Sequence, residues 1–411
     1  MNDMLASRVA HTKQSITMLI SARGQELRSK GINIIDFSIG EPQFNTPDYV
    51  KQGAIEAITQ NKTKYTPCGG IVELKQEICT KLQKENNLEY KPEEILVSCG
   101  AKHSLYNIFS ALIDEGDEVL IQTPYWASYP DQVKLLGGIP IFVNCDDNFR
   151  IDIQDLIKKI TLKTKLLIIN SPSNPSGVVL TDAELEKIAD VLIKYNLLCI
   201  SDEIYEKIIY DGKKHRSIAT ISPEVKKLIL VVNGVSKAYS MTGWRIGYTA
   251  GPKYIIDAMN KIQSQSTSNP TSISQWAAYH ALKGDTIFSD YCRDILENCR
   301  NLIVSLIRSI EIVNCMVPEG AFYVLIDVSK LYNDKITNSE ELCDKLLSEA
   351  HITCVPGSEF GVPNHIRLSY ATTIENIYAG IKKLDDWIFT NYKLNEATSK
   401  RNENIQSISF S

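Results

Sequence analysis

The most constraining feature of the sequence is an alternation between short apolar runs and amphipathic helical stretches, which extends from about residue 46 to residue 285. Most of the apolar runs are hydrophobic almost throughout, as in KLLIIN and LILVVNG. Strands of this kind are covered by helices on both faces of a sheet. The runs occupy residues 94–100, 118–124, 139–145, 165–170, 197–203, 228–234 and 245–251. The pattern predicts an α/β domain built on a mostly parallel sheet.

The pattern changes after residue 285 and predicts a second, smaller unit. A long helical stretch over residues 291–310 leads to short apolar runs in AFYVLIDV, HITCVPG and HIRLSYA, and a closing helix follows them. We therefore expect a large α/β domain over residues 46–285 and a small α+β domain over residues 286–394. The polar, aperiodic residues 395–411 are predicted to form a disordered tail.

Composition argues against several classes of partner. The formal net charge is −5 and the isoelectric point is about 5.8, whereas nucleic-acid binding requires concentrated positive charge. The ten cysteines are scattered along the sequence and include no CxxC pair, as is typical of free thiols in a reducing compartment. We therefore predict no metal ligands. The sequence contains neither a secretory signal pattern nor a long uninterrupted apolar window. We expect a cytoplasmic protein that contacts neither nucleic acid nor membrane.

Polar residues collect where the predicted strands end, which is where open α/β sheets bind ligands. Gly100 and Ala101 open a helix after the first strand, and a helix N-terminus with small residues can bind an anion, although glycine is also common in such turns for steric reasons. Asn174 lies in the irregular turn NSPSNPSG. Asp202 ends an apolar run, with Tyr205 three residues later. A buried carboxylate needs a cation or hydrogen-bond donors, so a structural salt bridge and a ligand's protonated ring nitrogen both remain open for Asp202.

The loop SKAYSMTGWRIGY contributes a lysine and an arginine at adjacent strand ends. Lys237 follows the run at 228–234, and Arg245 begins the next one. A lone lysine is most often a surface residue, but a buried amine can lose its proton and attack a carbonyl group. An anion site, a buried carboxylate, a phenol and this lysine would suit one ligand, an aldehyde that carries a phosphate and a basic ring.

Eight motifs occur in the order that is found in one family of enzymes. They are GEPQFNTP, KTKYTPCGG, TPYWASYP, NSPSNPSG, SDEIYE, SKAYSMTGWRIGY, GAFYVL and HIRLSYA. Through them the chain resembles, along nearly its whole length, the fold-type I pyridoxal-phosphate aminotransferases, and within class I it resembles the bacterial aspartate/prephenate aminotransferase branch. The resemblance implies an α/β fold with a large cofactor-binding domain and a small domain, and an N-terminal segment (residues 1–45) that contacts substrate and packs with the small domain.

The resemblance also implies how the cofactor, pyridoxal 5′-phosphate, is held. Lys237 would bind its aldehyde covalently and later move a proton, and Asp202 would pair with its ring nitrogen. Asn174 and Tyr205 would bond the ring's 3′-oxygen, and Trp126 would stack on the ring face, although a tryptophan here could also be an ordinary core residue.

For the phosphate, the resemblance implies Arg245 together with Gly100 and Ala101, and a tyrosine, Tyr65, that reaches the cofactor of the neighbouring subunit. A shared site of this kind implies a homodimer. Gly40 would lie where the N-terminal segment passes over the substrate.

Substrate selection is implied for a further set of residues. Arg367 matches the arginine that binds the substrate α-carboxylate, for which a planar guanidinium offers a bidentate grip. The positions matching those that select a second carboxylate, or prephenate, are Lys102, Ser15, Thr17 and Lys13. Taken singly these four could be plain surface residues. Together they favour amino transfer between aspartate or glutamate and a 2-oxo acid such as 2-oxoglutarate, oxaloacetate or prephenate.

The sequence departs from the family pattern at Gln14, where a proline is expected, at Ala101, where a glycine is usual, and at EPQF in place of EPDF. These departures leave substrate range open, and an aromatic or broad-specificity aminotransferase is the main alternative. A lyase or synthase of the same fold would use the same lysine. A cofactor-binding regulator would carry a DNA-binding module, for which the roughly forty-five residues before the α/β region are few.

Overall fold

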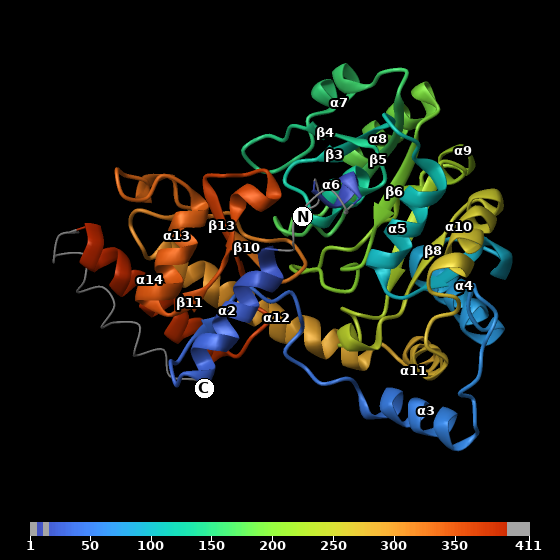
Figure 1. The fold of residues 1–411 in the computed structure, drawn as a ribbon, viewed down its shortest axis with the longest axis horizontal. Coiled ribbons are helices and arrows are strands. Elements are labelled where there is room, and N and C mark those ends of the chain that lie inside the picture. Colours follow the sequence, from blue (N-terminus) through green and yellow to red (C-terminus); the bar gives the residue numbers. More distant parts are fainter. Residues whose placement is uncertain (1–5, 11–15, 393–411) are drawn as a thin grey trace.

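The computed structural model describes residues 6–10 and 16–392 and has two lobes (Figure 1). One lobe contains a seven-stranded sheet and the other a four-stranded sheet. The predicted tail, residues 395–411, lies outside the described residues. The described part contains no helix that is both long and apolar enough to cross a membrane. All ten cysteines are free.

The seven-stranded sheet confirms the predicted strands of the α/β region. Its strands are β2 (Ile95–Ser98), β3 (Glu118–Gln122), β4 (Ile139–Val143), β5 (Thr164–Asn170), β6 (Leu198–Asp202), β7 (Ile229–Gly234) and β8 (Gly247–Ala250). They lie in the order β2-β8-β7-β6-β5-β3-β4. Only β8 runs antiparallel to its neighbours, so the sheet is mostly parallel, as the near-continuous apolar runs predict.

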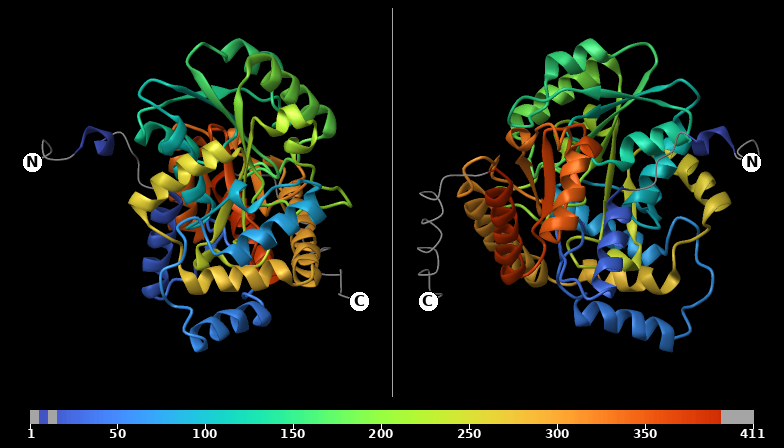
Figure 2. Two further views of the ribbon diagram at one scale, coloured as in Figure 1. Left: turned by 90° about the vertical axis from the view of Figure 1, so that its right-hand side faces the viewer. Right: turned by 60° about the vertical axis from the view of Figure 1, so that its left-hand side comes forward.

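Helices cover both faces of this sheet, as the left view of Figure 2 shows. On one face, side chains such as Val119, Ile168 and Leu230 pack against three helices. These are α5 (Ala101–Leu112), α6 (Ser128–Leu135) and α10 (Lys253–Ser266). The opposite face packs against a larger set. These helices are α3 (Asp48–Thr59), α4 (Val72–Asn86), α7 (Ile153–Lys159), α8 (Asp182–Tyr195), α9 (Pro223–Lys226) and α11 (Ser272–Lys283).

The second lobe is built on a smaller antiparallel sheet in the order β12-β13-β10-β9. Its strands are β9 (Asn314–Cys315), β10 (Tyr323–Asp327), β12 (Val355–Pro356) and β13 (His365–Ser369), and its helices are α12 (Ile287–Arg308), α13 (Ser339–Lys345) and α14 (Ile374–Tyr392). The N-terminal part of the chain joins this lobe: β1 (Ile35–Asp36) pairs in parallel with β11 (Ile352–Thr353). The helices α1 (Ser7–Ala10) and α2 (Ile16–Ser29) precede β1.

One predicted strand divides in two. The run HITCVPG was expected to form a single strand, but β11 pairs with β1 whereas β12 pairs with β13, so the chain passes from one sheet to the other at Cys354. Apolar composition alone gives no sign of this change of partner, because both halves are buried. The sequence signals for helices are more reliable here. Thr181 and Glu184, three residues apart, form a capping box at the start of α8, as this spacing of Thr and Glu predicts.

Candidate functional site

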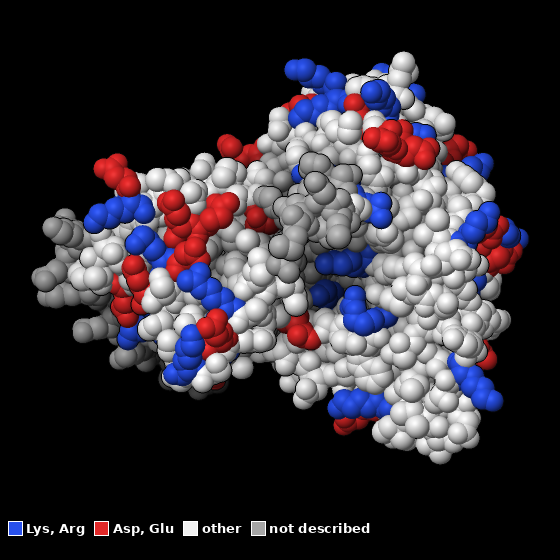
Figure 3. Space-filling model, in the orientation of Figure 1, with Lys and Arg blue, Asp and Glu red and all other residues white. Residues whose placement is uncertain are grey.

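A cavity of about 420 Å³ lies at the carboxyl ends of β5, β6 and β7, where residues from both lobes meet. Figure 3 shows Lys and Arg side chains gathered in the hollow between the lobes. Ten of the residues predicted for the site line the cavity: Gly40, Ala101, Lys102, Trp126, Asn174, Asp202, Tyr205, Lys237, Arg245 and Arg367. The sheet brings them together because parallel strands end at one edge.

Lys237 lies in the turn after β7, and its side chain enters the cavity. The Nζ atom donates a hydrogen bond of 2.6 Å to the carbonyl oxygen of Gly40. Burial lowers the pKa of the Lys237 amine to about 8; Glu41 opposes this shift, while Arg245 and Arg367 reinforce it. A lysine with such a pKa is partly neutral near physiological pH and can act as a nucleophile or a base.

Asp202, the last residue of β6, is a buried carboxylate with no ionic partner in the part of the chain that the structure describes. It is 3% exposed and accepts hydrogen bonds from the Tyr129 hydroxyl (2.7 Å) and the Ile204 amide (3.2 Å). Burial raises the pKa of Asp202 to about 6, against the effect of these two hydrogen bonds. Among residues 6–10 and 16–392, no basic side chain is in ion-pair contact with Asp202. The site therefore holds a negative charge that a bound cation would stabilise.

Arg367, on β13, is the converse case, a buried guanidinium that no carboxylate of the described residues pairs with. Its Nη1 donates to Asn174 Oδ1 (3.0 Å) and its Nη2 to the carbonyl oxygen of Ser38 (2.8 Å). Its Nε is buried and has no hydrogen-bond partner within the described ranges, where no acidic side chain forms an ion pair with it either. A buried arginine with free donor capacity is suited to binding a carboxylate.

A small anion would fit at the N-terminus of α5. Gly100 caps this helix with φ +89°, a conformation that favours glycine, and a Cβ there would overlap the Arg245 guanidinium. At Gly247 a Cβ would overlap the Ala101 amide nitrogen, so β8 also approaches the helix start closely. Arg245 is exposed beside these amides. Ala101 is the first residue of α5, outside the positive-φ region, and alanine is therefore unstrained at this departure from the family pattern.

Two of the predicted aromatic residues, Tyr205 and Trp126, line the cavity and contact different neighbours. The Tyr205 hydroxyl is 2.8 Å from the Tyr323 hydroxyl, and Tyr323 in turn lies 4.4 Å from the Arg367 guanidinium carbon, measured to the ring centroid. Trp126 packs edge-on against Tyr129, and the Lys102 Nζ lies 4.8 Å from the Trp126 ring centroid. Lys102 thus lies at the cavity, as the predicted role requires.

Five predicted residues are not among the described residues that line the cavity, and one of them, Gly100, precedes the lining residue Ala101 at the start of α5. Tyr65 does not line the cavity and is 93% exposed. Lys13 and Ser15 lie outside the described residues, and Thr17 is described only through the backbone of α2. The neighbouring Ile16 and Met18 do line the cavity, so α2 reaches the site.

Sequence reasoning missed two residues with clear places in the site. Tyr129 donates to Asp202, and Tyr323 links Tyr205 to Arg367. Both lie within quoted motifs, TPYWASYP and GAFYVL. Their apolar neighbours, however, make either tyrosine equally consistent with a core position. On β10, Tyr323 and Val324 point to opposite faces of the strand. Such alternation shows which residues share a face, but it does not show which other residues that face contacts.

The chemistry of the cavity fits an aldehyde that carries a basic ring and an anionic group. It offers the Lys237 amine, the Asp202 carboxylate, which has no cationic partner among the described residues, and the N-terminus of α5 beside Arg245. Arg367 remains to bind a second, carboxylate-bearing molecule.

The fold and this site define the class of protein. Residues 32–384 match the family described as aminotransferase class I and II, and the chain belongs to that family. Within it, the chain is similar to the aspartate aminotransferase of Bacillus sp. strain YM-2, at 46% identity over 94% of this chain and 100% of the relative. It is also 47% identical to the probable aspartate/prephenate aminotransferase of Rickettsia conorii, over 91% of this chain and 96% of the relative.

A solved structure shows the same fold. The aspartate aminotransferase of Thermus thermophilus, determined with maleate, superposes with a TM-score of 0.89 at 38% identity and covers 93% of this chain and 99% of its own. The predicted fold class and the predicted family are both confirmed.

Proposed function

We propose that the protein is a pyridoxal 5′-phosphate-dependent aspartate aminotransferase, which moves an amino group between L-aspartate or L-glutamate and a 2-oxo acid. One observation carries the proposal: a single cavity contains a lysine with a lowered pKa, a buried carboxylate and a buried arginine, and neither of these two charges has an ionic partner among residues 6–10 and 16–392. The names of the relatives, aspartate and aspartate/prephenate aminotransferases, support this choice of substrate.

The cofactor, when bound, would supply an aldehyde for the amino group and a ring that accepts electrons from the substrate α-carbon. Lys237 would hold the aldehyde covalently, and its Nζ, once free, would remove the proton from the substrate α-carbon. Its lowered pKa supports this role, because a base must be deprotonated near the working pH. Asp202, oriented by Tyr129, would keep a proton on the ring nitrogen.

The remaining cavity residues would orient the cofactor. Asn174 and Tyr205 would bond the ring oxygen, and Trp126 would cover the ring face. Arg245, with the amides of Gly100 and Ala101, would bind the phosphate.

Arg367 would bind the α-carboxylate of the substrate through the donor capacity that its contacts with Asn174 and Ser38 leave free. Lys102 would attract the second carboxylate from its place over Trp126. The predicted contributions of Ser15, Thr17 and Lys13 are supported by the position of Ile16 and Met18 at the cavity. Gly40 would let the N-terminal segment pass close to Tyr323, whose hydroxyl a Cβ at that position would overlap.

A homodimer with shared sites is part of the proposal. Tyr65 is 93% exposed, and the neighbouring segment also exposes Ile55, Ile58 and Val72. These side chains support an interface with a second copy that brings Tyr65 to the partner's cofactor. We also propose that residues 46–285 and 286–394 act as two domains, and that the smaller one closes on the substrate and excludes water. The ten free cysteines support a cytoplasmic location.

The test is a transamination assay of the purified protein with pyridoxal 5′-phosphate, aspartate and 2-oxoglutarate, in which oxaloacetate is measured. We expect turnover from the wild type and none from Lys237→Ala. A panel of donors and acceptors then defines specificity. A preference for aromatic over dicarboxylic donors would replace the aspartate assignment with the aromatic alternative, and substrate consumption without a 2-oxo acid product would point to lyase chemistry.

A further inference from the structure

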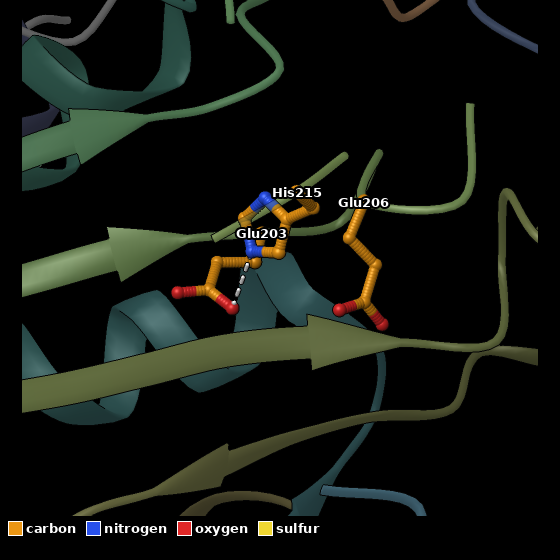
Figure 4. A group of neighbouring side chains, drawn as sticks. All are labelled: Glu203, Glu206 and His215. Atoms are coloured by element: carbon orange, nitrogen blue, oxygen red, sulfur yellow. Dashed lines mark hydrogen bonds and ion pairs between the residues drawn. The ribbon is translucent and has the colours of Figure 1, made fainter. Parts of the chain in front are cut away.

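A second group of buried ionisable side chains lies close to the cavity but does not line it. Figure 4 shows three of its members, Glu203, Glu206 and His215; the fourth is Lys81, from α4. We call these four residues the rear network. All four side chains are at most 7% exposed. The Lys81 ammonium forms ion pairs with Glu206 and with Glu85 of the same helix (3.6 Å), and His215, when protonated, adds a positive charge beside Glu203.

Internal partners satisfy the carboxylates of the rear network. Glu203 Oε1 accepts from the Ser201 and Ser217 hydroxyls (2.8 and 2.6 Å), and its Oε2 lies 2.9 Å from His215 Nε2. Glu206 Oε1 accepts from the Lys81 ammonium, and Glu206 Oε2 accepts from Asn86 (2.6 Å).

The arrangement of three potential ligands could suggest a metal centre, but two observations argue otherwise. The Lys81 ammonium already supplies the positive charge beside Glu206. The ring nitrogen of His215 that faces the carboxylates, Nε2, is already engaged in a hydrogen bond with Glu203 Oε2 at 2.9 Å, and Nδ1 points away from them (Figure 4). The group is therefore an internal network of ion pairs and hydrogen bonds. Any role in function depends on the backbone segment that this network holds in place.

The segment SDEIYE directs alternate residues to the cavity and to the rear network. Along β6, Ile200 packs against the α5 and α10 face of the sheet and Cys199 against the opposite face. By the same alternation Asp202 meets Tyr129 on α6, whereas Glu203 meets Ser217 and His215. The turn that follows returns Tyr205 to the cavity and Glu206 to the rear network.

Electrostatic interactions couple the cavity to the rear network. Burial is the main cause of the raised pKa of Asp202, and the charge of Glu203 adds to it. Lys81 and His215 lower the pKa of Glu206 to about 2 in spite of its burial, so this carboxylate stays charged at every physiological pH. Burial lowers the pKa of His215, but Glu203 and Glu206 outweigh that effect and raise it. Fixed charges in a buried network have directional partners, which apolar packing lacks.

We infer that the rear network is a positioning device: by holding Glu203 and Glu206 from behind the sheet, it fixes the backbone of residues 201–206 so that Asp202 and Tyr205 keep their places in the cavity. The inference rests on the proposed function of those two residues. Displacements well below 1 Å at a catalytic group reduce rates, and about 1 Å costs on the order of a hundredfold, which gives such a network a role beyond stability.

The test compares three variants of the holoenzyme. Glu203→Gln removes one charge and keeps the side-chain shape. The double variant Lys81→Met/Glu206→Leu replaces a buried ion pair with apolar side chains of similar size, an exchange that commonly preserves stability. Leu156→Ala, on the buried face of α7, is the matched control, because it creates a cavity at a fully buried residue outside the site.

We expect Glu203→Gln and the double variant to bind pyridoxal 5′-phosphate about tenfold more weakly, in titrations of the cofactor-free protein, and to lose about tenfold in kcat with KM for aspartate changed less than threefold. The absorbance maximum of the bound cofactor, or its pH titration, should also shift. Leu156→Ala should lower the melting temperature and leave these quantities unchanged.

The inference would be overturned if Glu203→Gln had the cofactor affinity, kcat and spectrum of the wild type. It would also be overturned if Leu156→Ala lost as much kcat and cofactor affinity as Glu203→Gln does. If the double variant fails to fold, Glu203→Gln remains decisive, since it retains the Lys81 pair. A wild-type protein that neither binds the cofactor nor transfers amino groups would instead refute the proposed function.

Discussion

At the scale of single residues, the cavity contains charges that the folded chain leaves without opposite partners. Asp202 has hydrogen-bond donors but no cation, and Arg367 has acceptors but no anion, among the described residues. Isolated buried charges destabilise a fold. Their presence in one cavity is physically reasonable because the ligands supply the missing charges.

The pKa of Lys237 leads to a first prediction. Because burial lowers it to about 8, from the ordinary value of 10.5, the amine loses its proton as pH rises through about 8 and only then attacks the cofactor aldehyde. The rate at which cofactor-free protein captures pyridoxal 5′-phosphate should therefore rise with pH and level off above about 8. Stopped-flow absorbance measures this rate. A midpoint near 10 would show that the amine is an ordinary exposed lysine, and Lys237→Ala should show no covalent capture.

Lys102 gives a second prediction. If its ammonium, held over Trp126, attracts the distal carboxylate of the substrate, Lys102→Ala should raise KM for aspartate by about tenfold and leave KM for alanine nearly unchanged. Steady-state kinetics with both donors separates the effects. Lys102→Arg keeps the charge and serves as the control. An equal change in KM for both donors would exclude this role.

At the scale of elements, the local sequence specifies where helices begin and which strands are buried. The capping box at α8 and the apolar runs of the seven-stranded sheet follow directly from residue type and spacing. Short strands are specified less well. The two residues of β1 pair with β11 more than three hundred positions away, and nothing local to either segment indicates the other.

The cap of α8 gives a third prediction. Thr181 Oγ1 accepts from the Glu184 amide at 3.3 Å, so Thr181→Ala leaves that amide without its partner and should lower the free energy of unfolding by about 1 kcal/mol. Urea denaturation followed by circular dichroism measures the change. Thr181→Ser keeps the hydroxyl and should behave as the wild type. Activity at 25 °C should be the same in all three proteins, because α8 contributes no residue to the cavity.

At the scale of the whole molecule, the site forms where the two lobes meet. Asp202 and Lys237 come from the lobe that contains the large sheet, whereas Arg367 and Tyr323 come from strands of the small sheet. The hydrogen bond between Arg367 and Asn174 joins the lobes directly at the cavity. Relative movement of the lobes would therefore change the distance between the groups proposed to bind cofactor and substrate.

The proposed dimer gives a fourth prediction. If Tyr65 serves the partner's site, a hybrid of a Tyr65→Ala subunit with a Lys237→Ala subunit contains one complete site, formed by the intact lysine of one subunit and the intact tyrosine of the other. Unfolding and refolding the two variants together should therefore yield more activity than the sum of the separately refolded proteins. No gain would show that Tyr65 acts within its own subunit or not at all. Refolded wild type sets the scale.

The sequence by itself determined the α/β class, the order of the strands along the chain and the family, because these depend on residue type and spacing that local physics and ordered motifs reveal. It also supplied ten of the residues that line the cavity. Tertiary structure alone decided which side chains meet. It paired Tyr129 with Asp202, joined Tyr205 to Tyr323 and assembled the rear network from α4 and the segment that follows β6. These contacts link residues far apart in sequence, and their energies depend on burial and partners that no local pattern contains.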